Sequence, residues 1–302
     1  MVREGSDRMA KVGILHSGTA RKHDKHINPL KNKIDITPGH TILPPRFASD
    51  NKGGELHRHA QDLVMQDNVD VLVAAGGTDC AGEANWASHL VKPPKLVVFT
   101  SVGGSFVPAD NMTGICARTS DLDAVRLYLL HEFLPASKHI GVLTSSRPLR
   151  PDLQQAAVQL GLTLRPTDVG KDETKIKKAF TDWAAASPAI QGVIVTANSF
   201  FNNHREEFNS AAGTPISPIP TIYQWREFAD EGGLISYGPN LTQAYQLAGT
   251  YVDNILNHRR TPADLPIVQL TKFELVINRK TANALGITVP QSLLDRADDV
   301  IT

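Results

Sequence analysis

Short, uniformly apolar segments alternate along the chain with longer segments of helical periodicity. The apolar segments that we predict to be strands are residues 11–18, 69–77, 95–104, 139–146, 192–201 and 214–225. The segments with apolar residues at helical spacing are residues 55–67, 78–90, 121–134, 151–161, 172–186 and 203–213. Alternation of this kind produces parallel sheets covered by helices, and strands that are apolar at every position are buried on both faces. The sequence therefore predicts an α/β fold.

The chain is long enough for two domains, each with its own core, because 41% of its 302 residues are hydrophobic. No apolar run approaches the length of about 18 residues that a transmembrane helix needs. Lysine plus arginine and aspartate plus glutamate both number 31, so the formal net charge is zero. We therefore expect no nucleic-acid partner. The first 18 residues contain charges but no apolar segment typical of a secretory signal peptide.

Small hydroxyl and amide residues recur where the predicted strands end. They are Ser17-Gly18, Gly76-Gly77-Thr78, Thr100-Ser101, Thr144-Ser145-Ser146 and Asn198-Ser199. In open α/β sheets the ligand binds at the carboxyl ends of the strands. We expect Gly76 and Gly77 to form a tight turn and Thr78 to cap the next helix, whose exposed N–H groups would receive a carboxylate. A structural cap with nothing bound is the alternative for any single turn, but five such turns favour a lined cleft.

Common catalytic and cofactor-binding motifs are missing from the sequence. There is no GxxxxGK[ST], GxSxG or HExxH motif, and no GxGxxG follows the first strand, so we expect no cofactor. The histidines of HDKH (23–26) and HRH (57–59) have no cysteine or carboxylate at zinc-like spacing, which favours a basic surface over a metal site. Cys80 and Cys116 are expected to be buried free thiols. A two-cysteine racemase is the alternative, and it would need one thiol on each side of a cleft.

Two long segments in the second half of the chain carry a family resemblance. They are IYQWREFADEGGLISYGPNLTQAYQLAGTYVDNIL (222–256) and TPADLPIVQLTKFELVINRKTANALGITVPQSLLDRADDVI (261–301). Both resemble the ABC-transporter substrate-binding protein family whose better-known members bind tryptophan and related aromatic amino acids. The resemblance is strong from about residue 190 onward and recognisable over residues 69–146.

The resemblance implies the fold of a type I periplasmic binding protein, in which two Rossmann-like lobes with parallel sheets are joined by a three-crossing hinge. The N-terminal lobe would comprise residues 10–114 and 240–262, and the C-terminal lobe residues 115–239 and 263–302. The implied function is that of a non-enzymatic solute-binding component of an ABC importer. Its partners would be a small organic ligand and the permease subunits. Its location would be periplasmic or extracellular and lipid-anchored, although a cytoplasmic ligand-sensing relative of the same fold is the alternative.

The resemblance also implies a set of ligand contacts from both lobes. They are Ser17, Gly77, Thr78, Ser101, Val102, Ser145, Asn198, Ser199, Phe200, Tyr223, Ser236 and Tyr237. Gly77 and Thr78 would receive a ligand carboxylate, and Phe200, Tyr223 and Tyr237 would supply flat apolar walls. Ordinary core packing is the alternative for these three aromatic residues.

One departure from the family pattern concerns the chemistry of the ligand. The family usually reads SVGDP after its fourth strand, whereas this chain reads SVGGS (101–105), with Gly104 in place of the aspartate. A buried ammonium without a partner is costly, so we expect a ligand that lacks an α-ammonium, such as an aromatic or aliphatic carboxylate. Replacement of the lost acid by Asp110 or by an ordered water is the alternative.

Overall fold

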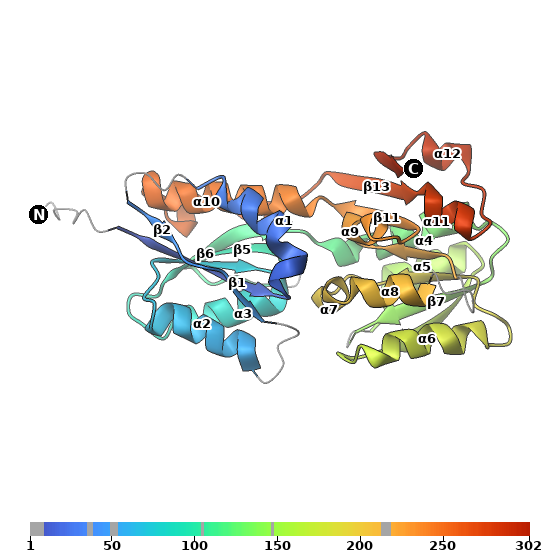
Figure 1. Cartoon of the computed structure of the whole chain (residues 1–302), viewed down its shortest axis with the longest axis horizontal. Helices are drawn as coiled ribbons and strands as arrows, with labels where there is room; N and C mark the ends of the chain where they lie inside the picture. The colour runs from blue at the N-terminus through green and yellow to red at the C-terminus, as the bar shows by residue number, and fades with distance from the viewer. Residues whose placement is uncertain (1–8, 35–38, 49–53, 104–105, 146–147, 213–218) are drawn as a thin grey trace, which may run out of the picture. The chain divides into compact units, whose positions relative to one another are not determined.

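The computed structural model describes residues 9–34, 39–48, 54–103, 106–145, 148–212 and 219–302 (Figure 1). The chain forms two compact units. Unit 1 comprises Met1–Arg118 and Leu241–Leu270, and unit 2 comprises Thr119–Asn240 and Thr271–Thr302. The chain therefore passes from one unit to the other three times.

Unit 1 is built on a parallel sheet with helices on both faces. Its strands are β1 (Lys11–Ser17), β2 (Thr41–Ile42), β3 (Arg46–Ala48), β4 (Val71–Ala75), β5 (Leu96–Val102), β6 (Met112–Cys116) and β12 (Val268–Gln269). Their order is β12-β6-β5-β4-β1-β2, and β3 also pairs with β1. The helices are α1 (Ala20–Lys31), α2 (Glu55–Met65), α3 (Thr78–Ser88) and α10 (Leu241–Asn257), with a 3-10 turn, η3, at Pro262–Asp264. Helices α1 and α10 cover one face of the sheet, and α2 and α3 cover the other (Figure 1).

The contact between α1 and α10 explains how a polar first helix, which contains Pro29, still contributes to the core. Its apolar residues Ile27 and Leu30 are buried. A Cβ atom at Gly249 of α10 would lie 2.2 Å from the carbonyl oxygen of Leu30, so glycine at this position permits the close approach of the two helices. One apolar face of α1 is thus sufficient to close this side of unit 1.

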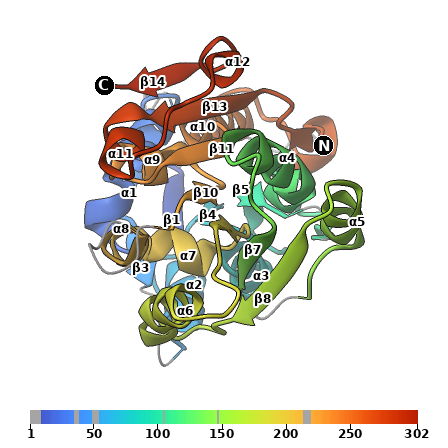
Figure 2. The ribbon, with the colours of Figure 1, turned by 90° about the vertical axis from the view of Figure 1, so that its right-hand side faces the viewer.

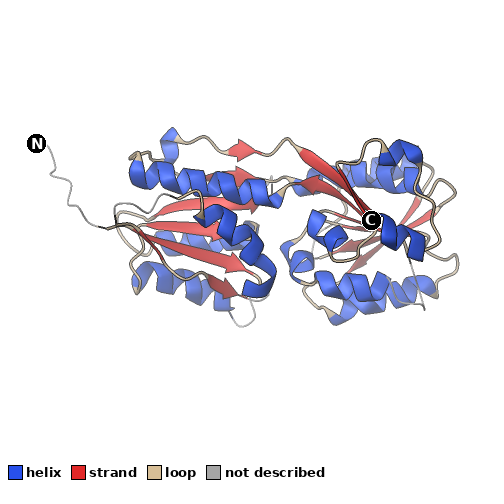
Figure 3. Cartoon of the chain, turned by 45° about the horizontal axis from the view of Figure 1, so that its top comes forward, coloured by secondary structure: helices blue, strands red, loops and turns tan. Residues whose placement is uncertain are grey.

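Unit 2 repeats the architecture, except that its last two strands along the chain run antiparallel to the other five. Its strands are β7 (His139–Thr144), β8 (Thr163–Asp168), β9 (Gly192–Val195), β10 (Thr221–Tyr223), β11 (Ile235–Pro239), β13 (Phe273–Asn278) and β14 (Asp299–Ile301). Their order is β14-β13-β11-β10-β9-β7-β8, and β13 is antiparallel to β11. Figure 3 shows the strands of each unit between its helices.

The helical segments of unit 2 lie on both faces of this sheet. They are η2 (Thr119–Leu122), α4 (Asp123–Phe133), α5 (Pro151–Gln159), α6 (Thr174–Ala184), α7 (Ser199–Asn203), α8 (Arg205–Ala212), α9 (Arg226–Asp230), α11 (Arg279–Ala284) and α12 (Gln291–Leu294). Helices α4 and α5 pack together on one face, and α6 and α8 pack together on the other (Figure 2).

The predicted α/β fold with two units is confirmed, but some predicted boundaries differ from the structure. The strand predicted over 192–201 ends at Val195, because Asn198 begins helix α7. Unit 1 extends to Leu270, beyond the expected boundary at 262, because β12 pairs with β6. Unit 2 begins at Thr119, after β6 has continued to Cys116.

Candidate functional site

The carboxyl ends of β1, β4 and β5 meet at one edge of the unit 1 sheet. The three strands are parallel neighbours, and the register aligns His16 with Ala75 and Ala75 with Thr100. The residues that follow these positions therefore lie at the same edge. Five of the candidate ligand contacts lie at this edge of the sheet, namely Ser17, Gly77, Thr78, Ser101 and Val102.

The loop from β4 to α3 is held against the end of β1. The Ser17 hydroxyl donates to the carbonyl oxygen of Gly76 at 2.6 Å. Gly76 has a φ of +125°, and a Cβ atom there would lie 2.4 Å from the Ser17 Oγ, so glycine is required by both conformation and space. The prediction that Thr78 caps α3 is wrong, because Gly77 occupies the N-cap and Thr78 is the first helical residue. The Thr78 hydroxyl instead accepts a hydrogen bond from the Gly103 N–H at 3.1 Å.

Helix α3 therefore begins without a side-chain cap. Its N-cap, Gly77, has no side chain that could accept a hydrogen bond from the first turn, and Asp79 places an acid in that turn. The N–H groups of the first turn of a helix have no partners within that helix and favour negative charge. This N-terminus lies at the carboxyl edge of the sheet, where the sequence predicted a carboxylate site.

The end of β5 is irregular. Ser101 has a φ of +62°, which is uncommon for a residue other than glycine, and the pairing with β6 shifts register between Phe99 and Val102. Irregular backbone of this kind is concentrated at binding sites and ligand clamps. The Val102 side chain is fully buried in the apolar cluster beneath α3. Gly104, where the sequence lacks the family's aspartate, lies outside the described residues.

The corresponding edge of unit 2 is formed by the carboxyl ends of β7 and β9. Asn198 is the N-cap of α7, and its side-chain oxygen accepts a hydrogen bond from the Phe200 N–H at 2.8 Å. Its amide nitrogen donates to the carbonyl oxygen of Ser145 at 3.3 Å, which joins the ends of the two strands. The Ser145 hydroxyl donates to the carbonyl oxygen of Gly170. Ser199 is half-buried beside them.

The predicted aromatic residues occupy different surroundings. Phe200 is 3% exposed, and its ring centroid lies 4.5 Å from that of His204. Tyr223 is fully buried, with its ring stacked on Phe228 at 4.6 Å, and burial raises the pKa of its phenol. The Tyr223 ring therefore packs in the core of unit 2, as the alternative interpretation of the sequence described. Tyr237 is half-buried in the middle of β11.

Two buried polar side chains lie at or next to the carboxyl end of β10. Gln224 directly follows β10 and is fully buried, and among the described residues neither its amide nitrogen nor its amide oxygen has a hydrogen-bond partner. Ser236 of β11 aligns with Tyr223, and its buried hydroxyl likewise has no partner in the described part of the chain. Buried polar groups are nearly always hydrogen-bonded, so these two require a partner other than the described protein. Gln224 is not among the residues expected from the sequence, although a glutamine between two aromatic residues at the end of an apolar strand was a visible signal.

Unit 1 contains a buried polar contact that the sequence did not predict. The His16 Nε2 lies 2.8 Å from the Tyr245 hydroxyl of α10, and burial lowers the pKa of His16 to about 3. The imidazole is therefore neutral near pH 7 and stays uncharged within the apolar interior of unit 1. This contact joins β1 to α10 across about 230 positions of sequence.

The two cysteines both lie in unit 1. The Cys80 thiol is buried, donates to the carbonyl oxygen of Leu15 at 3.2 Å, and has its pKa raised by burial. Among the described residues, no group of three histidine, cysteine, aspartate or glutamate side chains could hold a metal ion. Within the same described ranges, no helix is both long enough and apolar enough to cross a membrane.

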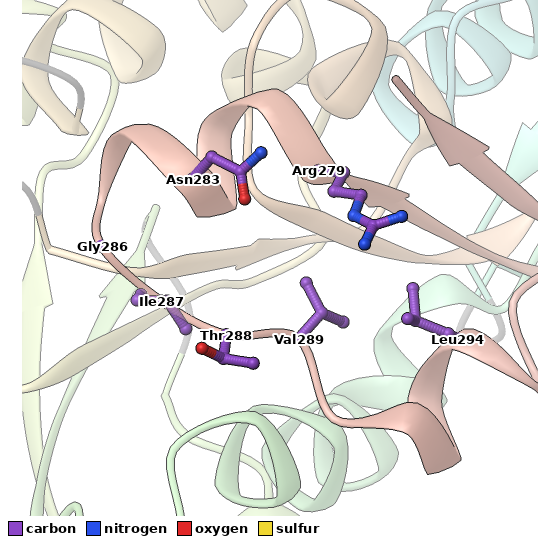
Figure 4. Close-up of a pocket in the computed structure, with 7 residues that line it drawn as sticks. All are labelled: Arg279, Asn283, Gly286, Ile287, Thr288, Val289 and Leu294. Atoms are coloured by element: carbon purple, nitrogen blue, oxygen red, sulfur yellow. The ribbon is translucent and has the colours of Figure 1, made fainter.

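A surface pocket of about 250 Å³ lies elsewhere in unit 2 (Figure 4). Its lining residues are Arg279, Asn283, Gly286, Ile287, Thr288, Val289 and Leu294. Strand β13 is antiparallel to β11, so α11, which follows β13, begins beside Leu234 at the amino end of β11. The pocket therefore belongs to the edge of the sheet opposite Ser145 and Asn198, and it is separate from the predicted site residues.

A family model identifies the family of the chain, and solved structures identify its fold. The family model described as ABC transporter substrate binding protein matches residues 34–301. No curated protein matches the sequence. A conserved domain protein from Vibrio cholerae is similar in structure, with a TM-score of 0.79 and 22% identity over 97% of this chain and 100% of the other.

Two further solved structures contain ligands. The ABC domain in complex with L-Trp from Streptococcus pneumoniae has a TM-score of 0.78 and 20% identity over 96% of this chain and 100% of the other. An ABC transporter solute-binding protein from Bacillus halodurans with bound myo-inositol has a TM-score of 0.62 and 10% identity over 93% and 97% of the two chains. At these identities the likeness shows the fold, which is that of the periplasmic binding proteins.

Proposed function

The chain belongs to the ABC transporter substrate-binding protein family, and from this premise we propose that it captures a small organic ligand between its two units and delivers it to an ABC permease. Closure would occur by rotation of the units about the three crossings, which is how two-unit binding proteins enclose their ligands. The site of action would be outside the cytoplasmic membrane, where the permease receives its solute.

The observation that carries the proposal is the pair of buried polar side chains Gln224 and Ser236, which have no hydrogen-bond partner among the described residues, together with the polar strand ends of both sheets. A buried amide without a partner costs about 1–3 kcal/mol, so its retention is explained if a ligand or a ligand-bound water completes its hydrogen bonds. In unit 1 the uncapped start of α3 beside Ser17 offers backbone N–H groups to an anionic group. Polar groups in both units are therefore available to orient one small molecule.

We propose that the ligand carries a carboxylate but no α-ammonium. The carboxylate would sit at the N-terminus of α3, and Asn198 and Gln224 would provide neutral hydrogen bonds from unit 2. Phe200 would contribute apolar surface beside them. The support is the replacement of the family's aspartate by Gly104, which removes the acid that would pair with an ammonium.

Native mass spectrometry of the purified protein, before and after unfolding and refolding, tests whether it retains a ligand. We expect a mass increment of one small molecule that disappears after refolding and returns when the released compound is added. A protein that carries no compound, and is stabilised by none of the probes below, would contradict the proposed function.

Thermal-shift measurements with matched probes test the ligand class. The pairs are L-tryptophan with indole-3-propionate and L-phenylalanine with 3-phenylpropionate, each compound differing from its partner in the α-ammonium. A probe at 100 times its Kd should add about 2.7 kcal/mol to the free energy of unfolding. Stabilisation by the amino acids and not by their deaminated partners would overturn the ligand class while leaving the binding function intact.

A further inference from the structure

Arg126 of α4 joins separate parts of unit 2 through a single buried guanidinium. The side chain is fully buried. Its Nε donates to the carbonyl oxygen of Tyr237 at 2.8 Å, and its Nη2 donates to the carbonyl oxygen of Thr119 at 3.1 Å. Its Nη1 donates to Asp123 at 2.5 Å. Three of the five guanidinium N–H donors are thus directed at three different residues.

The two carbonyl groups belong to the segments by which the chain enters and leaves unit 2. Thr119 is the first residue of the unit, and Tyr237 lies three residues before Asn240, where the chain returns to unit 1. The Arg126 side chain therefore joins two segments of backbone that are separated by more than 100 residues of sequence.

The third crossing is held to the same structure through the sheet. The chain re-enters unit 2 at Thr271, and β13 then pairs with β11, aligning Phe273 with Pro239 and Glu274 with Gly238. The Asn240 side-chain amide also donates to Glu274 at 3.4 Å. The start of β13 is therefore bound to the end of β11, where Tyr237 accepts a hydrogen bond from Arg126.

Packing at Gly238 leaves little freedom at this point. A Cβ atom there would lie 2.0 Å from the carbonyl oxygen of Gln224 and 3.7 Å from the Nη2 of Arg126. The backbone of β11 at Gly238 is thus in close contact with Gln224, which follows β10, and lies near the guanidinium of Arg126. The last residues of β11, the first residues of unit 2 and the start of α4 are therefore connected through the hydrogen bonds of Arg126.

We propose that Arg126 is a positioning residue for ligand capture, which keeps the unit 2 ends of the three crossings together so that bending is confined to their unit 1 ends. The inference rests on the proposed function, because it concerns the closure of the units. A buried ion pair is weak evidence for stability, since apolar replacements of similar volume are often as stable. Its retention is better explained by the two backbone carbonyls that it connects.

A matched pair of substitutions separates this role from ordinary stabilisation. Arg205 is 1% exposed in the same unit, and its Nε and Nη1 donate to Glu231 at 2.9 Å and to the carbonyl oxygen of Asn202 at 2.7 Å. Arg126→Lys and Arg205→Lys therefore make the same chemical change at two buried arginines that each contact a carboxylate and backbone. They differ in their backbone partners, which are Thr119 and Tyr237 for Arg126 and Asn202 for Arg205.

The readout is the distribution of distances between the two units in the ligand-free protein, measured by pulsed electron paramagnetic resonance. Spin labels are attached at Gln61→Cys in α2 and Gln155→Cys in α5, both of which are exposed positions. Cys116 is replaced by serine, and Cys80 is left in place because its thiol is buried. Hydrogen exchange of η2 and of residues 237–240 is measured on the same variants.

We expect Arg126→Lys to widen the distance distribution at least twofold and to accelerate exchange in both segments together, while Arg205→Lys leaves both quantities as in the parent. If Arg126→Lys does not fold, Asp123→Asn, which preserves the shape of the side chain, is measured instead and should change both quantities in the same direction. Parental widths and exchange rates in the variant that folds would overturn the proposal. No ligand is used, so a failure of the proposed function would not affect this result.

Discussion

Replacing Gln224 by methionine should stabilise unit 2 and weaken ligand binding. Gln224 is fully buried, and its amide nitrogen and oxygen have no hydrogen-bond partner among the described residues. Methionine has a similar length and no polar head group, so it fills the same space without requiring a partner. A residue that lowers stability and is nevertheless needed for binding is characteristic of a functional site.

The size of the effect follows from the cost of burying a polar group without a partner. This cost is about 1–3 kcal/mol for a neutral group, so we expect Gln224→Met to raise the free energy of unfolding of unit 2 by about 1–3 kcal/mol. The matched control is Asn278→Leu. Asn278 is 4% exposed, but its amide nitrogen donates to Ala229 at 2.9 Å and its amide oxygen accepts from the Thr281 N–H at 3.0 Å. Its replacement should lower the free energy of unfolding by a similar amount.

Urea unfolding followed by tryptophan fluorescence can report on unit 2 alone. Of the three tryptophans, Trp86 lies in unit 1, whereas Trp183 and Trp225 lie in unit 2. Both variants are therefore prepared in a Trp86→Phe background. A midpoint that rises for Gln224→Met and falls for Asn278→Leu, with unchanged slopes, is the expected result.

Loss of stability in both variants would refute this reasoning. It would mean that the Gln224 amide has partners in the native protein, such as ordered waters that remain in place without a ligand. Retention of the co-purified compound by Gln224→Met, at the occupancy seen for the parent, would separately exclude Gln224 from the binding site.

Three further predictions concern single sites. Gly114→Ala should lower the free energy of unfolding, measured by calorimetry, by about 3 kcal/mol or more, because the added Cβ would lie 2.1 Å from the Phe99 carbonyl oxygen. The control is Gly82→Ala in α3, where the added Cβ meets no atom and the change should be neutral or stabilising. Burial raises the pKa of Asp123 to about 6 from 3.8, and the nearby charges are those of Arg126, Asp152 and Arg150. This group should therefore contribute about 3 kcal/mol of stability below pH 4, and the contribution should be lost as the pH rises through 6. Asp123→Asn should remove that pH dependence, and parallel pH profiles of the two proteins would contradict it. A thiol reagent should modify Cys116 in the native protein and Cys80 only after unfolding, since Cys80 is fully buried and Cys116 is half-buried. Modification of both cysteines in the native protein would contradict the burial of Cys80.

The sequence was sufficient for the elements whose apolar residues determine their conformation. Strands such as β4, which is buried at all five positions, produce an apolar run that has few other interpretations. The edge strand β8 was missed because its residues are exposed or half-buried and include Pro166 in the middle of the strand. The two-residue strands β2 and β12 were missed because such short pairings depend on the strands beside them, which a local pattern does not identify.

The predicted site residues show a similar division. The sequence located the carboxyl ends of the strands, since glycine, serine and asparagine follow apolar runs there. It did not show how the side chains use their polar groups. Thr78 was expected to cap a helix, but its hydroxyl accepts a hydrogen bond from Gly103, which comes from a different strand end. Such a contact depends on the order of the strands in the sheet and cannot be read from residues 72–84 alone.

The hydrogen bonds of the strand ends also indicate which polar residues are most informative about a ligand. Ser17 donates to Gly76, Ser145 donates to Gly170, and Asn198 uses both halves of its amide within unit 2. These side chains already have a structural role, because each fixes the loop that follows a strand, and their substitution would disturb the site whether or not they contact a ligand. Gln224 has no such partner within the described part of the chain. A loss of binding in Gln224→Met without a loss of stability is therefore the result that would connect this buried amide directly to the ligand.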